Sequence, residues 1–296
     1  MTDHPLKGLC IRSGVVWQKD KGFLLACDPK TEEQSPHAKI VRWHRGVFSH
    51  TSAKFNAHSI CRIRAPEEAL VFACSEGFYG IYTQTRSIGG NIFSDSRPVP
   101  KQLRYGSIRS VSGIAGKAYA VGLRGMVYRL DGMGVWTRID DGLPESFDVQ
   151  AIDGFHEGDL YAVGFRGELW HFDGLKWAKR ELPTNVNLTS VKCGGDRSVY
   201  LAGHDGMLIR RKTDQWETID SEEMTKDIWD LEWFDGALFV STYFGVYRLS
   251  GAELEPVDFG GDRAKSYHLS AAEDVMWSIG ETDVMAFDGT DWTRIV

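Results

Sequence analysis

Short apolar runs recur along this chain, and each ends at a small residue. Five of them align without gaps: Ala118–Gly122, Leu160–Gly164, Val199–Gly203, Leu238–Thr242 and Met276–Gly280. Each is followed by a second apolar run, which in most cases leads into a turn and a Trp. In the second run after Gly122, apolar Met126, Tyr128 and Leu130 alternate with Val127, Arg129 and Asp131. This period of two predicts a half-buried β-strand rather than a helix.

These runs define a repeat. Two weaker matches, Phe23–Cys27 and Leu70–Cys74, extend the series to seven modules spaced 38 to 48 residues apart. In the module that contains Gly122, the pattern predicts strands at 108–113, 118–122, 126–130 and 135–139. Seven modules of four short strands predict an all-β fold, a seven-bladed β-propeller with four antiparallel strands per blade.

The same pattern predicts a single propeller domain over residues 1–296, because no linker rich in Pro or Ser interrupts it. The repeats are clear over 107–296, whereas 1–106 holds divergent blades with insertions. We expect the segment Asp291–Val296 to form an outermost strand, and Leu9–Arg12 is a candidate to pair beside it. A closed ring would leave no sheet edge open to aggregation.

The blade pattern, V-Y-A-V-G followed by a second strand, D-G and a Trp, resembles bacterial WD-repeat, YVTN and Asp-box-like propellers, including relatives of photosystem assembly factors. The resemblance covers 118–296 clearly and 15–117 loosely. It departs from a true Asp box because Phe287–Trp292 is one residue shorter. The resemblance implies the fold and leaves the activity open, since propellers carry many unrelated functions.

The strong catalytic strings are missing: the sequence holds no G-x-S-x-G, H-E-x-x-H, Walker or EF-hand pattern. Arg62 and Arg64 are weakly similar to the arginine-containing strand of sialidase-type propellers, so a glycan hydrolase stays open as a third hypothesis. The spacing of His44, His50 and His58 does not predict a zinc site. We therefore predict a protein that is not an enzyme and that binds no metal or cofactor.

Composition indicates where in the cell the protein is located. Hydrophobic residues make up 42% of the chain, and no run approaches the roughly 18 apolar residues of a membrane span. The first 20 residues lack the apolar core of a secretory signal. Five cysteines form no C-x-x-C pair, which is typical of a reduced protein. We expect a cytoplasmic location and no contact with a membrane.

Charge is divided unevenly along the chain. Residues 1–130 contain 19 basic and 9 acidic residues, a net charge of +10, whereas 131–296 contain 15 and 32, a net charge of −17. The stretches 38–66 and 96–130 contain no acidic residue. A polyanion such as nucleic acid is therefore an alternative partner for the N-terminal blades.

A candidate binding surface follows from the predicted topology. In a four-stranded blade, the turn between strands two and three and the connection to the next blade share one face. These segments vary in chemistry while their flanks do not, and aromatic and Arg side chains gathered there are typical of a protein-binding hot spot. The predicted partner-binding residues in these turns are Phe78, Tyr79, Arg124, Phe165, Arg166, His204, Asp205, Tyr243 and Phe244.

Acidic residues concentrate in two of the predicted connections, 140–148 and 220–227. The predicted partner-binding residues there are Asp140, Asp141, Glu145, Glu222 and Glu223. Such a surface would attract a basic partner and speed its capture. The leading hypothesis is therefore a bacterial immunity protein that binds and masks a secreted toxin, such as a nuclease delivered by a type VI secretion system.

Overall fold

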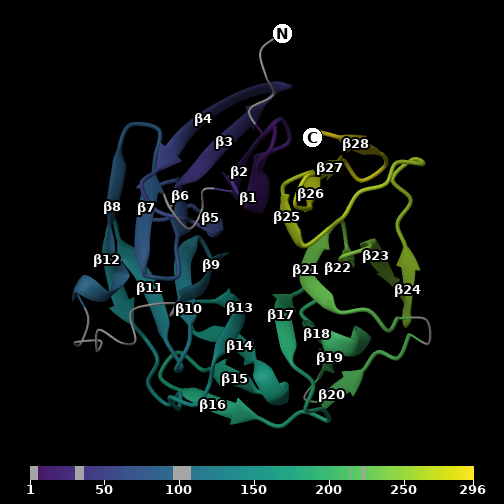
Figure 1. Cartoon of the computed structure of the whole chain (residues 1–296). Helices are drawn as coiled ribbons and strands as arrows, with labels where there is room; N and C mark the ends of the chain where they lie inside the picture. The colour runs from purple at the N-terminus through teal and green to yellow at the C-terminus, as the bar shows by residue number, and fades with distance from the viewer. Residues whose placement is uncertain (1–5, 31–36, 96–107, 214, 222–223) are drawn as a thin grey trace. The chain divides into compact units, whose positions relative to one another are not determined.

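The chain folds into seven four-stranded antiparallel sheets, the blades of a β-propeller. The computed structural model describes residues 6–30, 37–95, 108–213, 215–221 and 224–296 (Figure 1). It divides into two compact units, 1–56 with 189–296 (unit 1) and 57–188 (unit 2). The predicted fold class is confirmed. The prediction of one domain over 1–296 stays a prediction.

Unit 2 holds three sheets, each built from strands in chain order. Their strands are β5 (Ser59–Ile63), β6 (Ala69–Ala73), β7 (Phe78–Tyr82) and β8 (Ser87–Asn91); β9 (Ile108–Ile114), β10 (Lys117–Gly122), β11 (Val127–Gly132) and β12 (Val135–Arg138); β13 (Val149–His156), β14 (Asp159–Gly164), β15 (Leu169–Phe172) and β16 (Trp177–Arg180). The strands predicted around Gly122 are therefore correct to within two residues.

Unit 1 holds the other four sheets. Their strands are β1 (Cys10–Gln18), β2 (Lys21–Cys27), β3 (Ala38–His44) and β4 (Val47–Ala53); β17 (Leu188–Cys193), β18 (Val199–Gly203), β19 (Leu208–Lys212) and β20 (Gln215–Thr218); β21 (Ile228–Phe234), β22 (Ala237–Thr242), β23 (Gly245–Ser250) and β24 (Glu253–Pro256); β25 (His268–Ala272), β26 (Val275–Ile279), β27 (Val284–Phe287) and β28 (Trp292–Arg294).

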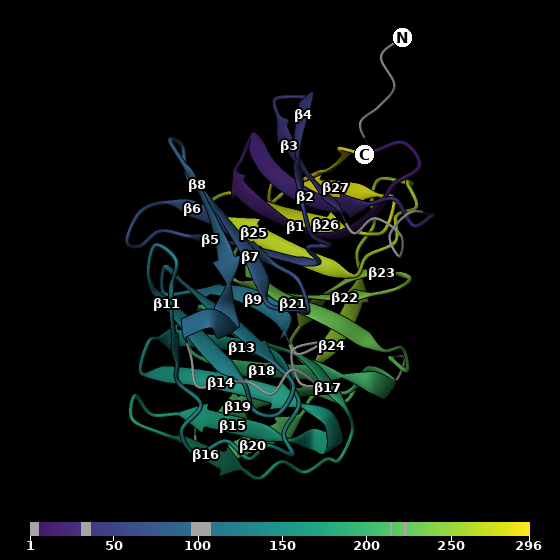
Figure 2. The ribbon, with the colours of Figure 1, turned by 60° about the vertical axis from the view of Figure 1, so that its left-hand side comes forward.

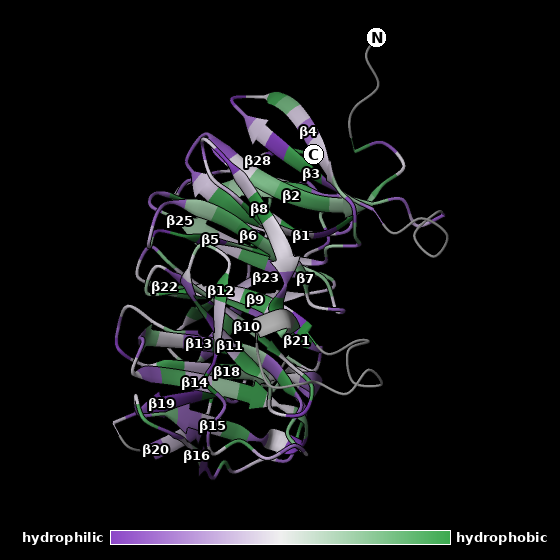
Figure 3. Cartoon of the chain, turned by 90° about the vertical axis from the view of Figure 1, so that its left-hand side faces the viewer, coloured by the Kyte–Doolittle hydropathy of each residue, from purple (hydrophilic) through white to green (hydrophobic). Residues whose placement is uncertain are grey.

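Burial follows the order of strands within a sheet. The second strand is buried on both faces, as in β6 and β26. The fourth strand is largely exposed, as in β20. Figure 3 shows this contrast, with β2 and β18 largely hydrophobic and the region of β19 and β20 largely hydrophilic. The repeated apolar runs of the sequence are these second strands.

The first and last sheets of the chain meet in unit 1. Strand β1 lies beside β25 and β26 (Figures 1 and 2), and the N–H of Val16 donates to Oγ of Ser270 at 3.0 Å. Strand β28 pairs with β27, as expected for an outermost strand. The expected place of Leu9–Arg12 beside that strand is wrong. Cys10 and Ile11 pair with β2 and begin the first strand of their own sheet.

Helix contributes little to the described residues. The segments η1 (Ile92–Asp95), η3 (Phe165–Gly167) and η4 (His204–Gly206) are single 3-10 turns. In the ranges that the structure covers, none of the helices has the length and hydropathy needed to cross a membrane.

Candidate functional site

Three of the turns between second and third strands share one geometry. Arg124, Arg166 and Asp205 each take a left-handed conformation, with φ of 60°, 60° and 55°. Each backbone N–H donates at 3.0 Å to a side-chain oxygen of the connection to the next sheet. The three acceptors are Asp148, Asn187 and Asp227. The predicted proximity of these turns and connections is confirmed.

A glycine follows each left-handed residue for two reasons. At Gly167 and Gly206 φ is again positive, 65° and 70°, a region that L side chains rarely adopt. A Cβ would also stand 2.2 Å from the Thr184 carbonyl oxygen and 2.0 Å from that of Met224. Backbone of the next connection thus lies directly against the turn, which fixes both segments.

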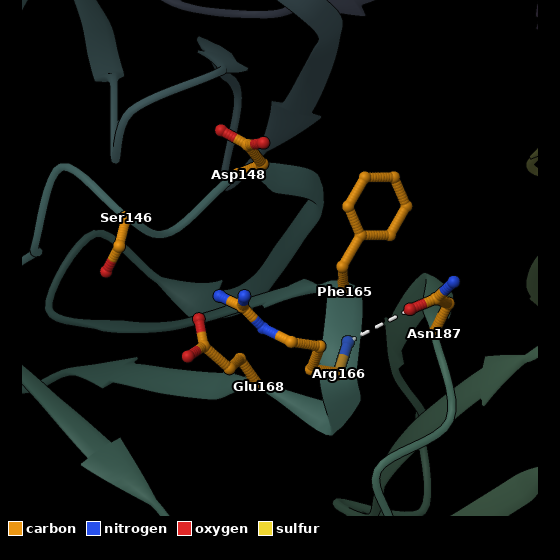
Figure 4. A pocket seen from close by; sticks show the side chains of 6 residues that line it. All are labelled: Ser146, Asp148, Phe165, Arg166, Glu168 and Asn187. Carbon is orange, nitrogen blue, oxygen red and sulfur yellow. Dashed lines mark hydrogen bonds between the residues drawn. The ribbon is translucent and has the colours of Figure 1, made fainter.

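In unit 2 this geometry builds a cleft of about 310 Å³. Figure 4 shows the guanidinium of Arg166 extending toward Glu168, with the ring of Phe165 on the other side. The Phe165 side chain is 37% exposed. The residues that line the cleft are Ser146, Asp148, Phe165, Arg166, Glu168 and Asn187. It thus combines one guanidinium, two carboxylates and an accessible ring.

The two arginines of these turns differ in their partners. Arg124 forms an ion pair with Glu145. The position equivalent to Glu145 in the next connection is Asn185, because Pro144 and Thr184 both lie against a turn glycine. Accordingly Arg166 forms no ion pair with any described residue. Of the two, Arg166 is therefore the one available to a carboxylate of a partner.

Unit 1 carries a continuous row of aromatic rings, which we call the aromatic row. Ring centroids lie 5.9 Å apart for His204 and Trp229, 6.4 Å for Trp229 and Tyr267, 5.3 Å for Tyr267 and Tyr243, and 5.3 Å for Tyr243 and Phe244. Phe244 is 69% exposed and Trp229 is 39% exposed. The row thus joins three predicted residues to two that were not predicted.

Two lysines flank the aromatic row. Lys265 places Nζ 4.5 Å from the ring centroid of Tyr243 and donates a hydrogen bond to its hydroxyl. Lys226 places Nζ 5.4 Å from the centroids of both Phe244 and Tyr247, and donates to Tyr247 Oη at 2.8 Å. The hydrogen bond to Tyr243 raises the pKa of Lys265 above its ordinary value.

A partly buried ion pair lies next to the row. Asp230 follows Trp229 and His268 follows Tyr267, and His268 Nδ1 lies 2.5 Å from Asp230 Oδ2. Burial alone would raise the pKa of Asp230, but His268 and backbone N–H donors lower it. Burial alone would lower the pKa of His268, but the Asp230 carboxylate raises it above 6.5. The pair therefore ties β21 to β25 next to Trp229 and Tyr267 in the sequence.

The remaining predicted residues differ in how exposed they are. Phe78 is 48% exposed, but its neighbour Tyr79 is buried, with its ring against Trp136 and its hydroxyl donating to the Gly134 carbonyl at 3.1 Å. Tyr79 therefore belongs to the core and we remove it from the surface set. Asp141 is exposed, whereas Asp140 is largely buried in an ion pair with Arg138. Glu222 and Glu223 lie outside the described residues.

Sequence reasoning missed Trp229, Tyr267 and Asn187. A signal for Asn187 was present, because Asp148, Asn187 and Asp227 each directly precede the first strand of a sheet. Trp229 and Tyr267 gave no such signal. Their contact depends on how β21 and β25 lie side by side, which the repeat alone does not specify.

Some of the residues considered for catalysis and for polyanion binding form ion pairs in the structure. Arg62 forms an ion pair with Glu68. Burial raises the pKa of the Cys61 and Cys74 thiols to about 12. Across the described ranges, no three His, Cys, Asp or Glu side chains are grouped to hold a metal ion. Several basic side chains of 38–66 and 96–130 are paired with carboxylates: Arg45, Arg62, Lys117, Arg124 and Arg129.

Comparison with known proteins identifies one relative of full length. The chain is 36% identical to the immune protein Tsi7 of Pseudomonas aeruginosa over 299 residues, covering 96% of each chain. No family model matches.

Among solved structures, a catalytically inactive virginiamycin B lyase from Staphylococcus aureus has a TM-score of 0.74 at 10% identity, covering 97% of this chain and 96% of that one. YCF48 bound to D1 peptide has a TM-score of 0.70 at 14% identity, covering 96% and 93%. These two likenesses confirm the propeller fold and carry no functional assignment.

Proposed function

Because this chain belongs to the family of the immune protein Tsi7, we propose that it neutralises a cognate secreted toxin by binding it. The chain is a bacterial immunity protein with a propeller fold, and its role is binding rather than catalysis. The single observation that carries this assignment is 36% identity over 96% of both chains. A match of this extent spans every blade, so it is not a likeness of one repeat.

The proposed contact surface consists of the turns between second and third strands and the connections beside them. Arg166 and Phe165 form one anchor in unit 2, and the exposed ring of Phe244 forms another in unit 1. Exposed aromatic and arginine side chains are the residues that most often dominate binding energy at protein interfaces. The N–H of Arg166 donates to Asn187 and the N–H of Phe244 donates to Thr242 Oγ1 at 3.2 Å, so both anchor turns are held in place before binding.

The partner is proposed to be a basic protein, such as a nuclease. The net charge of −7, with −17 carried by residues 131–296, supports attraction of a basic toxin. Exposed acidic residues such as Asp141 lie in the connections that adjoin the anchors. Long-range attraction of this kind raises the association rate more than the final affinity.

The cellular location is proposed from where such a toxin would act. A toxin delivered between bacteria by a type VI secretion system would act inside the recipient, and an immunity protein has to reside where the toxin acts. A nuclease acts in the cytoplasm, so we propose a cytoplasmic location for this protein. The gene of the toxin is expected beside the gene of this chain.

Expression of the neighbouring reading frame in a bacterial host tests the proposal. The frame alone should stop growth, and co-expression of this chain should restore it. The purified pair should form a complex on size-exclusion chromatography. Growth arrest without rescue, or the absence of a complex, would overturn the proposed function.

A fluorescent single-stranded oligonucleotide, titrated at two salt concentrations, tests the polyanion alternative. That alternative requires tight binding that weakens steeply with salt.

A further inference from the structure

The aromatic row of unit 1 has the features of an anchoring surface rather than of a core. Its rings come from four separate segments, so no single turn explains their contact. Phe244 and Trp229 are among the most exposed large hydrophobic residues of the described chain. Contiguous exposed aromatic surface on a folded protein marks an interaction site more often than an accident of packing.

The flanking lysines indicate the chemistry of the occupant. Neither Lys226 nor Lys265 forms an ion pair with a described carboxylate, although each is held over an aromatic ring. The hydrogen bonds to Tyr247 and Tyr243 use one N–H of each ammonium group. A lysine has three N–H donors, so each retains donors for an acceptor on a partner. Carboxylates of the partner are the matching acceptors.

Nearby carboxylates argue against a nucleic acid as the occupant. In the sequence, Asp205 directly follows His204, a member of the row, and Asp227 directly follows Lys226. Glu281 is close enough to Tyr267 to raise its pKa, after the larger effect of burial. A phosphate backbone carries a negative charge at every nucleotide along the row, whereas a protein loop brings carboxylates only at the two lysines, of which Lys265 also feels Glu281.

We propose that the aromatic row receives a loop of the toxin that presents an apolar side chain flanked by Asp or Glu. This inference rests on the proposed function, since it assigns the anchor of the same complex. The apolar side chain packs on the rings of the row, which is exposed at Trp229 and Phe244, and the carboxylates accept hydrogen bonds from Lys226 and Lys265. A basic toxin can carry such a loop, because overall charge governs approach and local charge governs contact.

The ion pair between Asp230 and His268 positions two rings of the row before binding. Asp230 and His268 each directly follow a ring of the row, and their contact sets the distance between Trp229 and Tyr267. Asp230 also accepts hydrogen bonds from Ser190 Oγ at 3.1 Å and from the Leu269 N–H at 3.0 Å. Rings held in place before binding lose little conformational entropy when the partner arrives.

Calorimetry with the purified product of the neighbouring reading frame tests the inference. Trp229→Ala and Phe244→Ala should each weaken the complex about 30-fold or more, as for anchors of an interface. The double change Lys226→Glu with Lys265→Glu should weaken it further than Lys226→Ala with Lys265→Ala. The matched control is Val47→Ala, because Val47 is 67% exposed in unit 1 and begins β4, at the other end of its sheet's strands from the turn between β2 and β3. It should bind like the unmodified protein.

The outcomes separate the two proposals. If the aromatic variants keep native circular dichroism and still bind as tightly as the unmodified protein, the inference is wrong while the proposed function stands. If the unmodified protein neither binds nor neutralises the product, the proposed function itself fails. If a single-stranded oligonucleotide of 20 nucleotides binds the unmodified protein but not Trp229→Ala, the row is a nucleic-acid site and the inference is overturned.

Discussion

His268 points one ring nitrogen at the carboxylate of Asp230 and the other at a backbone carbonyl. Nδ1 lies 2.5 Å from Asp230 Oδ2, and Nε2 lies 3.1 Å from the Gly14 carbonyl oxygen. Two acceptors facing both nitrogens favour the doubly protonated ring, which donates to each. This arrangement explains why the carboxylate raises the pKa of the ring despite burial. The cation thereby joins β1, β21 and β25.

Stability should depend on pH through this pair. The pKa of His268 is raised above 6.5 in the folded state, so its contribution is complete below about pH 6.5 and is lost as pH rises through the folded-state pKa. The pKa of Asp230 is lowered below 3.8, so the contribution of the carboxylate is lost only as pH falls through that lower value. The pair therefore stabilises fully in mildly acidic solution.

Replacing His268 with Gln, which cannot carry charge, should expose this dependence. We expect His268→Gln to cost about 1 kcal/mol at pH 5.5 and less at pH 9, a modest value because the histidine side chain is 36% exposed. Urea unfolding followed by Trp fluorescence at both pH values measures it. His50→Gln, a change at an exposed histidine of β4, serves as the control. A loss that is equal at both pH values would contradict the assignment.

The turn around Asp205 should depend on one side-chain oxygen. Asp227→Ala removes the acceptor of the Asp205 N–H, and we expect a loss of about 1 kcal/mol of unfolding free energy. Asp227→Asn keeps an oxygen at the same place and should restore most of that loss, because Asn187 serves naturally in the equivalent turn. Denaturant unfolding of the three proteins measures both effects. If Asn and Ala destabilise equally, the hydrogen bond is not the cause.

The fold was predictable because it repeats. The residues chosen as equivalent points, from Cys27 to Gly280, all lie at or directly after the end of a second strand. That strand is buried on both faces, so its apolar run survives in every module while the other strands vary. The first sheet was harder to place, since the pairing of Cys10 with β2 leaves no distinct pattern in the sequence.

The candidate surface was predictable only in part. Locating the turns was enough to find Arg166 and Phe244, but not to separate Phe78 from Tyr79. Those two neighbours point to opposite faces of β7, and Tyr79 is the buried one because its ring packs against Trp136. Trp229 joins the surface through a contact with Tyr267, and such contacts between distant segments are set by tertiary structure rather than by local pattern.

A side chain at Gly206 should destabilise the protein for two reasons, backbone strain and close contact. A change at Gly236 tests the strain alone. Gly206→Ala introduces a strained φ of 70° and a Cβ at 2.0 Å from the Met224 carbonyl oxygen. Gly236→Ala introduces strain of the same kind, with φ of 73°, but meets no atom within 4 Å. Strain alone costs about 1–2 kcal/mol. We expect Gly206→Ala to destabilise by at least about 1 kcal/mol more than Gly236→Ala in thermal or urea unfolding, since the Met224 backbone has to move. Equal losses would show that the next connection yields freely.

The acidic connections should raise the rate at which the toxin associates with this protein. Asp141 is exposed, and Glu222 and Glu223 belong to the other acidic connection. Reversing these three to Lys should slow association about tenfold at low ionic strength, because attraction of a basic partner acts before contact. Asp140 is left unchanged, since its ion pair with Arg138 serves the fold.

Salt and position provide the controls for this reversal. Surface plasmon resonance at low and high salt should show the association rates of the two proteins converging as salt rises, while the dissociation rates stay similar. Glu253→Lys with Glu255→Lys changes two exposed positions of the outer strand β24 and should slow association less per charge. If reversal on β24 slows capture equally per charge, net charge alone steers the toxin. If neither reversal changes the association rate, the toxin is not drawn in by charge, and its capture depends on contact at the anchors.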